Sequence, residues 1–158
     1  MMQEFNSLTG GCMCGAVRYS INSAPEFVIQ CFCRDCQLAT GTGHTTVVGV
    51  LDENFRVDGA PKTYTTTGDT GGKVVRHFCG TCGSRLFTSG DLPGPLRMVQ
   101  SGTLDDPNRV TPQAAVYLGK AAHWDKVDPD LPQFEGMYPL EQPPQEVGIK
   151  PAPGASPR

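Results

Sequence analysis

Cysteine is the residue type in this chain with the most chemical potential. Seven cysteines fall into three short clusters: CMC at 12–14, CFCRDC at 31–36 and CGTC at 79–82. A disulfide uses two thiols, and a closed structural zinc site uses four. The three thiols of the middle cluster fit neither arrangement. Their number suggests a metal site with an open position, or a fourth ligand elsewhere in the chain.

The spacing within each cluster has a geometric interpretation. Residues i and i+2 of an extended strand point to the same face, so a C-x-C pair can direct both sulfurs to one metal ion. A C-x-x-C pair needs a tight turn, and Gly80 and Gly83 around the last cluster permit one. Thiolates are the ligands of tetrahedral zinc sites. The three clusters are therefore candidate zinc ligands.

Four and three is the economical division of seven thiols between two zinc ions. The triplet is too compact in sequence to be shared between distant metals, so the two pairs must join each other. We therefore expect a structural zinc ion, which ties two distant segments together, on Cys12, Cys14, Cys79 and Cys82. We expect a catalytic zinc ion, with one position left for water or substrate, on Cys31, Cys33 and Cys36.

Several alternatives remain open at this point. A histidine could close the second site, and His44, eight residues after Cys36, is the best candidate. A redox dithiol at Cys79 and Cys82 is another reading. A disulfide framework does not suit an odd number of cysteines, and the C-x-C-x-x-C spacing does not match ferredoxin clusters. Arginines near the clusters are expected to balance the thiolate charge, namely Arg34, Arg76 and Arg85.

The elements that must position these thiols are mostly strands. Windows rich in β-branched and aromatic residues occur at 16–21, 26–32, 44–51, 55–59, 63–67, 73–79, 85–89, 96–104 and 113–119. Gly- and Pro-containing turns separate them. The sequence predicts an all-β domain of antiparallel sheets, with one helical turn in CRDCQLATG that ends at Gly41. We expect this domain to span residues 1–136 and a proline-rich, flexible tail to follow at 137–158.

Bulk composition narrows the function further. The chain has 158 residues and a formal net charge of -3, with no long basic run, so we expect no nucleic-acid partner. No stretch approaches the about 20 apolar residues of a membrane helix, and we expect no membrane partner. The sequence MMQEFNSLTGG lacks the basic and apolar regions of a signal peptide. We therefore expect a cytoplasmic protein, whose thiols serve metal binding rather than disulfides.

Three segments, GGCMCGAVRY, CFCRDCQLATG and HFCGTCGSRLF, occur in this order between Thr9 and Trp124. In this the chain resembles the glutathione-dependent formaldehyde-activating enzyme family, which also contains the centromere protein V domain. The resemblance implies a β-tent fold with two zinc ions per chain, on the same four and three cysteines as above. Phe32 departs from the pattern, because many members of the family have histidine at this position.

The resemblance also implies an activity. It is a carbon–sulfur lyase reaction that interconverts S-(hydroxymethyl)glutathione with formaldehyde and glutathione, so the expected partner is a small-molecule thiol such as glutathione. The alternative is a zinc-stabilised module that binds glutathione or a protein without turnover. The fourth ligand of the second zinc ion discriminates between them, since water or a thiol there favours the enzyme and a side chain favours the module. The sequence leaves the oligomeric state open.

Overall fold

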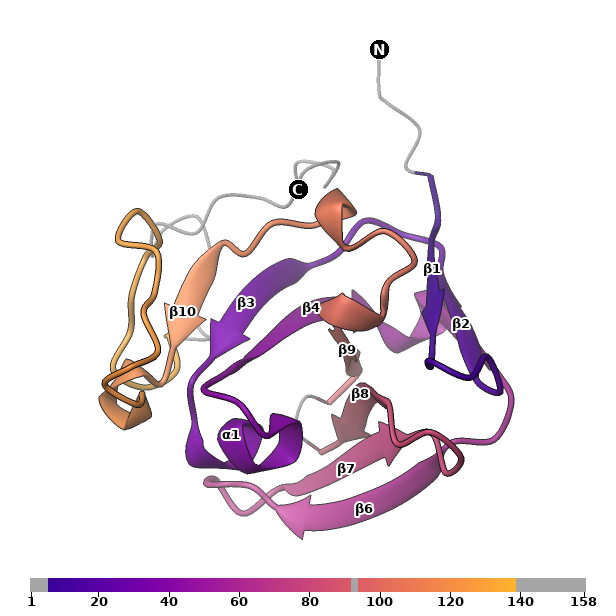
Figure 1. Ribbon diagram of the computed structural model, residues 1–158, viewed down its shortest axis with the longest axis horizontal. Coiled ribbons are helices and arrows are strands. Elements are labelled where there is room, and N and C mark those ends of the chain that lie inside the picture. Colours follow the sequence, from indigo (N-terminus) through magenta and orange to yellow (C-terminus); the bar gives the residue numbers. More distant parts are fainter. Residues whose placement is uncertain (1–5, 92–93, 139–158) are drawn as a thin grey trace.

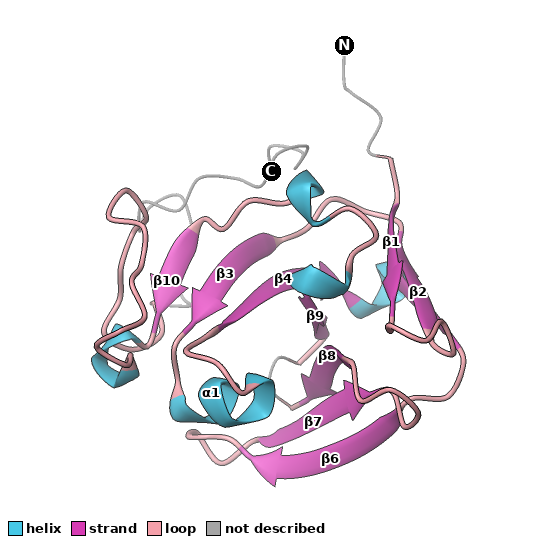
Figure 2. Ribbon diagram, in the orientation of Figure 1, coloured by secondary structure: helices cyan, strands magenta, loops and turns pink. Residues whose placement is uncertain are grey.

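The computed structural model describes residues 6–91 and 94–138. Within these residues the chain is mainly β, with strands in two sheets, one short α-helix and a few three-residue 3-10 helices (Figure 2). The prediction of an all-β domain is therefore confirmed. No helix among the described residues is both long and apolar enough to cross a membrane.

The smaller sheet is antiparallel and has the order β1-β2-β5. Its strands are β1 (Leu8–Gly11), β2 (Arg18–Ile21) and β5 (Phe55–Asp58). The larger sheet has seven strands in the order β10-β3-β4-β9-β8-β7-β6. They are β10 (Ala114–Val116), β3 (Phe27–Cys31), β4 (Thr45–Leu51), β9 (Leu96–Gln100), β8 (Arg85–Gly90), β7 (Lys73–Phe78) and β6 (Lys62–Thr67). In Figure 1 this sheet curves from β10 and β3 at the upper left to β7 and β6 at the bottom.

Two features of the sheets differ from the sequence prediction. Strand β1 was not predicted, because two of its four residues, Gly10 and Gly11, have little strand propensity. Strand β10 pairs with β3 in parallel, with Ala114 opposite Ile29, whereas the other pairs between the described strands are antiparallel. The parallel pair places residues 114–116 at the edge of the sheet beside the strand that ends at Cys31.

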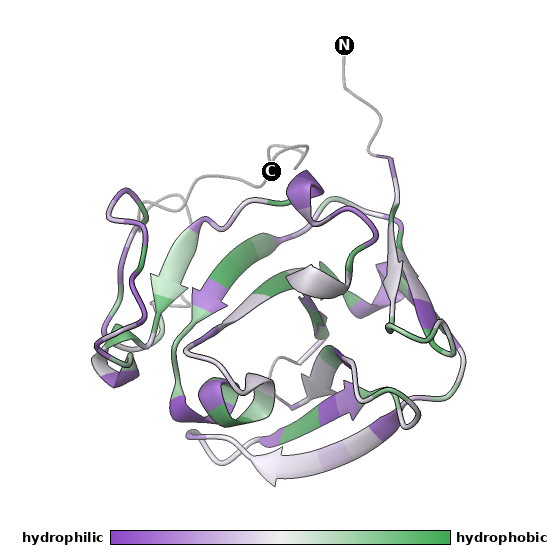
Figure 3. Cartoon of the chain, in the orientation of Figure 1, coloured by the Kyte–Doolittle hydropathy of each residue, from purple (hydrophilic) through white to green (hydrophobic). Residues whose placement is uncertain are grey.

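Alternation along the strands divides the buried residues between two clusters. Val28 packs in a first cluster, together with buried residues of the smaller sheet such as Ile21 and Phe55. Its neighbours Phe27 and Ile29 point to the other face of β3 and pack in a second cluster. Figure 3 shows β3 as hydrophobic along most of its length and hydrophilic toward its end. The second face of the larger sheet is the one that carries the thiol triplet.

The α-helix α1 (Arg34–Thr40) lies where the sequence predicted a helical turn. Cys33 is its N-cap residue, and the Cys33 sulfur accepts a hydrogen bond from the Cys36 N–H at 3.3 Å. Gly41 ends the helix in the left-handed conformation, with φ of 73°, which glycine adopts without steric cost. The cap therefore holds two cysteines of the triplet on the same turn of chain.

Residues 134–138 pack along the edge strand. The N–H of Phe134 donates to the carbonyl of Ala115 at 2.9 Å, and Tyr138 is buried in the second cluster. Met137 packs against the same cluster. These contacts involve the first two residues of the segment expected to be a tail. The rest of it, residues 139–158, lies outside the described residues.

Candidate metal centres

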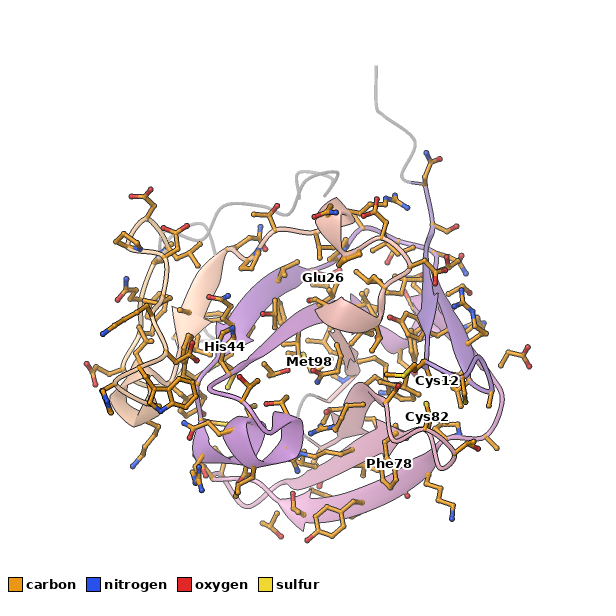
Figure 4. All side chains as sticks on the ribbon, in the orientation of Figure 1. Cys12, Glu26, His44, Phe78, Cys82 and Met98 are labelled. Atoms are coloured by element: carbon orange, nitrogen blue, oxygen red, sulfur yellow. The ribbon has the colours of Figure 1, made fainter. Side chains whose placement is uncertain are left out.

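The first and last cysteine clusters meet although 65 residues separate Cys14 from Cys79 in the chain. The sulfurs of Cys12, Cys14, Cys79 and Cys82 all lie within 4.8 Å of one another. Those of Cys12 and Cys14 are 3.6 Å apart, and those of Cys14 and Cys79 are 3.7 Å apart. Four thiolates at about 2.3 Å from one zinc ion would stand about 3.8 Å apart in a tetrahedron. The donor set and its spacing therefore fit zinc. Figure 4 shows Cys12 and Cys82 close together.

A tight turn, rather than an extended strand, presents Cys12 and Cys14. Strand β1 ends at Gly11, and the N–H of Gly15, which has φ of 80°, donates to the carbonyl of Cys12 at 3.1 Å. The extended conformation predicted for this C-x-C pair is therefore wrong. The N–H of Val17 also donates to the Cys12 sulfur at 3.2 Å and lowers the pKa of that thiol. The turn thus supplies a hydrogen bond that favours the thiolate.

The C-x-x-C pair follows β7 in a second tight turn, as predicted. The N–H of Gly83 donates to the carbonyl of Cys79 at 2.9 Å, and Gly83 has φ of 78°. The hydroxyl of Ser84 lies 3.2 Å from the Cys82 sulfur, and hydrogen bonds from Ser84 lower the pKa of Cys82 to about 5. The same hydroxyl accepts from the N–H of Met13 at 3.0 Å. Ser84 therefore joins the two turns, a role that its sequence position did not reveal.

The triplet lies at the junction of β3 and α1. Cys31 ends the strand, Cys33 caps the helix, Cys36 lies in the first helical turn, and their sulfurs are all within 4.8 Å of one another. The pKa of Cys33 is lowered because the thiols of Cys31 and Cys36 donate to its sulfur. The pKa of Cys36 is raised by its contacts with Cys31 and Cys33. Close contact among the three thiols thus favours the thiolate at Cys33 over that at Cys36, and a cation bound to the triplet would favour deprotonation of all three.

His44 is engaged elsewhere. Its Nδ1 lies 2.7 Å from Oδ2 of Asp125, and its ring stacks on Phe32 with centroids 4.7 Å apart. Its Nε2 lies 3.5 Å from the side-chain nitrogen of Gln30. Because Gln30 and Phe32 alternate with Cys31, His44 lies on the side of the chain away from the Cys31 sulfur. Within residues 6–91 and 94–138, no fourth histidine, cysteine, aspartate or glutamate joins the three thiols.

Two hollows adjoin the triplet. A cavity of about 450 Å³, here called the chamber, is bordered by Cys31 and Cys36 and by the second face of the larger sheet. A cleft of about 620 Å³, here called the outer cleft, is bordered by Cys33. Arg76 and Tyr117 border both. Ligands could therefore approach the three thiols from two directions.

The three arginines expected to balance the thiolate charge differ in their contacts. Arg34 donates to Gln37 on the exposed side of α1. Arg76 donates to Thr66 at 2.7 Å and lies 3.6 Å from Asp35. Arg85 lies beside the chamber, where burial lowers its pKa and the proximity of Cys36 opposes that effect. Arg76 and Arg85 thus bring positive charge to the chamber, while Arg34 borders the outer cleft.

Comparisons with known proteins bear on the fold and the family. A crystal structure of a Rhodobacter sphaeroides protein, solved as a structural genomics target, matches with a TM-score of 0.51 and 22% sequence identity. The match covers 61% of this chain and 87% of that chain, and it supports the fold. A comparison with curated proteins gave no match. A family model described as glutathione-dependent formaldehyde-activating enzyme matches residues 7–120, which include all seven cysteines. This chain therefore belongs to the glutathione-dependent formaldehyde-activating enzyme family.

Proposed function

We propose that this protein is a zinc-dependent carbon–sulfur lyase that joins a small thiol, such as glutathione, to an aldehyde and cleaves the adduct in the reverse direction. The observation that carries the proposal is the triplet of Cys31, Cys33 and Cys36. Its three sulfurs converge, no fourth protein ligand joins them among the described residues, and both hollows reach them. Three protein ligands and one free position are typical of catalytic zinc.

The chain's own residues prepare the reaction in two ways. The N-cap geometry fixes Cys33 against the Cys36 N–H, and the end of β3 fixes Cys31, so the three sulfurs are gathered before any ligand arrives. When bound, zinc would supply a position at which a substrate thiol loses its proton near neutral pH. Hollows on two sides of the sulfurs can hold both reactants at once, and this proximity lowers the entropic cost of reaction.

The chemistry requires no oxidant or reductant. A bond forms between the thiol sulfur and the carbonyl carbon, and the π electrons of the C=O bond move to oxygen. That oxygen takes up the proton that the thiol released. In the reverse direction the hydroxyl of the adduct loses its proton, the C=O bond re-forms and the C–S bond breaks.

The outer cleft supports a charged peptide thiol as one reactant. Positive and negative side chains both border it: Arg34, Arg76, Lys120, Asp35, Asp69 and Glu135. Glutathione carries two carboxylates and one ammonium group, and a border of mixed charge can pair with both signs. This argument supports a zwitterionic thiol in the outer cleft, with its sulfur directed at Cys33.

The four-cysteine group has a separate role in the proposal. Zinc on Cys12, Cys14, Cys79 and Cys82 would be structural, since it would join the turn after β1 to the turn after β7. We therefore propose two zinc ions per chain. All seven thiols are free of disulfides, and zinc binding requires them in the reduced state, which favours the cytoplasm as the compartment.

The test must separate catalysis from an easy spontaneous reaction. Exchange between free glutathione and its formaldehyde adduct would be measured by NMR exchange spectroscopy, with and without the zinc-loaded protein. The proposal predicts faster exchange with the parent, and the uncatalysed rate with a folded Cys33→Ser variant. Binding of glutathione without faster exchange would instead support the non-catalytic module.

A further inference from the structure

The walls of the chamber are largely apolar. Phe27 and Ile29 of β3, Val47 of β4 and Val116 of β10 are all buried and face it. The other apolar or aromatic residues that border it are Ala39, Val74, Leu96, Met98, Tyr117, Met137 and Tyr138. Strand alternation explains this, because these β3 and β4 positions are on the face opposite the first core cluster. The apolar walls lead directly to Cys31 and Cys36.

The size of the chamber does not match a one-carbon aldehyde. Formaldehyde has two heavy atoms and takes up on the order of two water volumes, or roughly 60 Å³. The chamber measures about 450 Å³, which lies in the range of pockets that enclose small organic ligands much larger than formaldehyde. Formaldehyde would leave most of the apolar wall in contact with water. A longer apolar ligand would displace that water and gain the free energy of burial.

One polar group at the chamber has hydrogen-bonding capacity to spare. The Nε and Nη1 atoms of Arg85 are buried, and none of the described residues, the cysteine sulfurs included, accepts a hydrogen bond from them. Two other polar side chains at the chamber, Thr45 and Arg76, do have partners. Thr45 donates to Gln100, and Arg76 donates to Thr66. A buried donor without a partner is costly, and such a group in a native structure calls for a functional explanation.

We propose that the chamber binds an aldehyde with an apolar chain of several carbons, and that Arg85 donates hydrogen bonds to its carbonyl oxygen. The identity of the reacting group as an aldehyde rests on the proposed function, whereas the apolar chain and the oxygen acceptor rest on the chamber itself. The thiol would lie in the outer cleft beside Cys33, and the aldehyde would lie in the chamber beside Cys31 and Cys36.

This arrangement gives Arg85 a role in the reaction as well as in binding. As the C–S bond forms, the electron pair of the C=O bond becomes negative charge on oxygen, which then takes the proton released by the thiol. A guanidinium that donates to that oxygen interacts more strongly with the developing charge than with the neutral carbonyl. Arg85 therefore favours attack on an aldehyde in the chamber.

Unreactive carbonyl probes can test the chamber without any turnover. Primary amides from formamide to hexanamide present a carbonyl oxygen and a chain of increasing length, and they do not add thiols under mild conditions. Their affinities would be measured on the full-length, zinc-loaded protein by NMR chemical-shift titration. The proposal predicts about fourfold tighter binding per added methylene until the chamber is filled. Equal affinity for formamide and hexanamide, or no binding of either, would overturn it.

Two kinds of variant separate the contribution of the ligand's apolar chain to binding from that of its carbonyl oxygen. Arg85→Gln should weaken every amide by roughly tenfold or more and leave the factor per methylene unchanged. The control is Arg56→Gln, at an exposed position of β5 and absent from the chamber lining, which should change neither quantity. Met98→Trp should fill the chamber and remove the dependence on chain length. Leu96→Trp serves the same purpose should Met98→Trp fail to fold. Unchanged amide binding in Arg85→Gln would contradict the assignment of Arg85.

The outcomes distinguish this inference from the proposed function. Suppose that the protein catalyses exchange with formaldehyde, but that neither amide binding nor aldehyde exchange depends on chain length. The proposed lyase activity would then stand, and the proposed role of the chamber would be refuted. Binding that depends on chain length, without faster thiol–aldehyde exchange for any aldehyde, would support the chamber and refute the lyase. We expect both results to be positive, with the acceleration over the uncatalysed exchange rising from formaldehyde to hexanal.

Discussion

The imidazole ring of His44 stacks on the ring of Phe32, with centroids 4.7 Å apart and an angle of 29° between the ring planes. Phe32 is fully buried and lies between two cysteines of the triplet in the sequence. Oδ2 of Asp125 lies 2.7 Å from Nδ1 of the same imidazole ring. The stacked rings of His44 and Phe32 therefore pack against the junction of β3 and α1 on the side away from the Cys31 sulfur. The three sulfurs border the chamber and the outer cleft.

Replacing His44 should affect stability but not metal binding. We expect His44→Ala to lower the free energy of unfolding by about 1–3 kcal/mol, because it removes the stack on Phe32 and leaves partly buried Asp125 without its partner. The zinc content should stay at two ions per chain. Metal analysis and urea denaturation would check both expectations. Loss of one zinc ion from a folded variant would show that His44 closes the second site.

Replacing a ligand of the four-cysteine group should damage folding. Cys12→Ser and Cys82→Ser each leave three thiols at a site that ties the turn after β1 to the turn after β7. Loss of a structural metal ion can remove most of a domain's stability of ~5–15 kcal/mol. Circular dichroism melting of both variants would test this. Soluble protein with unchanged melting in both cases would count against a structural zinc ion.

The ion pair between Asp105 and Arg18 should contribute to the stability of the protein in a way that depends on pH. Hydrogen bonds from Arg18 and Thr9 lower the pKa of Asp105 from its ordinary value of 3.8 to about 2. A depressed pKa in the folded state means that the stabilisation is present above pH 3.8 and is lost as the pH falls towards 2. Because both side chains are nearly half exposed, we expect Asp105→Asn to cost only up to about 1 kcal/mol.

Urea denaturation of the parent and of Asp105→Asn checks this prediction. The difference in free energy of unfolding should be the same at about pH 6 and about pH 8, because both lie above the titration window of Asp105. It should shrink in about 1 M salt, which screens exposed charges. A difference that grows between these two pH values would mean that another group controls it.

Gly49 allows strand β4 to pack against Phe27 at the wall of the chamber. A Cβ atom on Gly49 would lie 2.5 Å from the Phe27 ring, so Gly49→Ala must displace that ring. We expect a loss of about 1–3 kcal/mol in the free energy of unfolding. Gly102→Ala is the matched control, because a Cβ atom there meets nothing within 4 Å. Equal stability of the two variants would show that the Phe27 ring can move aside at little cost in free energy.

Much of the fold could be predicted because its strands have strong local signals. The β-branched run at 44–51 and the window at 73–79 became β4 and β7 with small changes at their ends. Weak or overridden signals account for the differences. Strand β1 contains two glycines and is stabilised by pairing with β2. The strand predicted at 113–119 ends at Val116, because Tyr117 adopts a left-handed conformation with φ of 59°.

Only the part of the candidate site that depends on the spacing of the cysteines in the sequence could be predicted. The structure brings together the same four and three thiols that the spacing grouped. The supporting residues came from contacts with no signal in sequence. Asp125 reaches His44 across 81 positions, and Ser84 reaches Met13 across 71. Arg85 was expected to balance charge, but its two unpaired buried nitrogens and the apolar chamber beside it depend on tertiary packing.

The measurement that tests the central claim most directly is the zinc content of Cys33→Ser, together with its far-UV circular dichroism and glutathione binding. The account predicts a folded domain with one zinc ion, against two in the parent, and no glutathione binding. The four-cysteine group does not include Cys33, so the fold should survive, while the open site is reduced to two thiols. An unfolded variant would mean that the triplet is structural. A folded variant that binds glutathione as the parent does would mean that the thiol does not bind at this metal site.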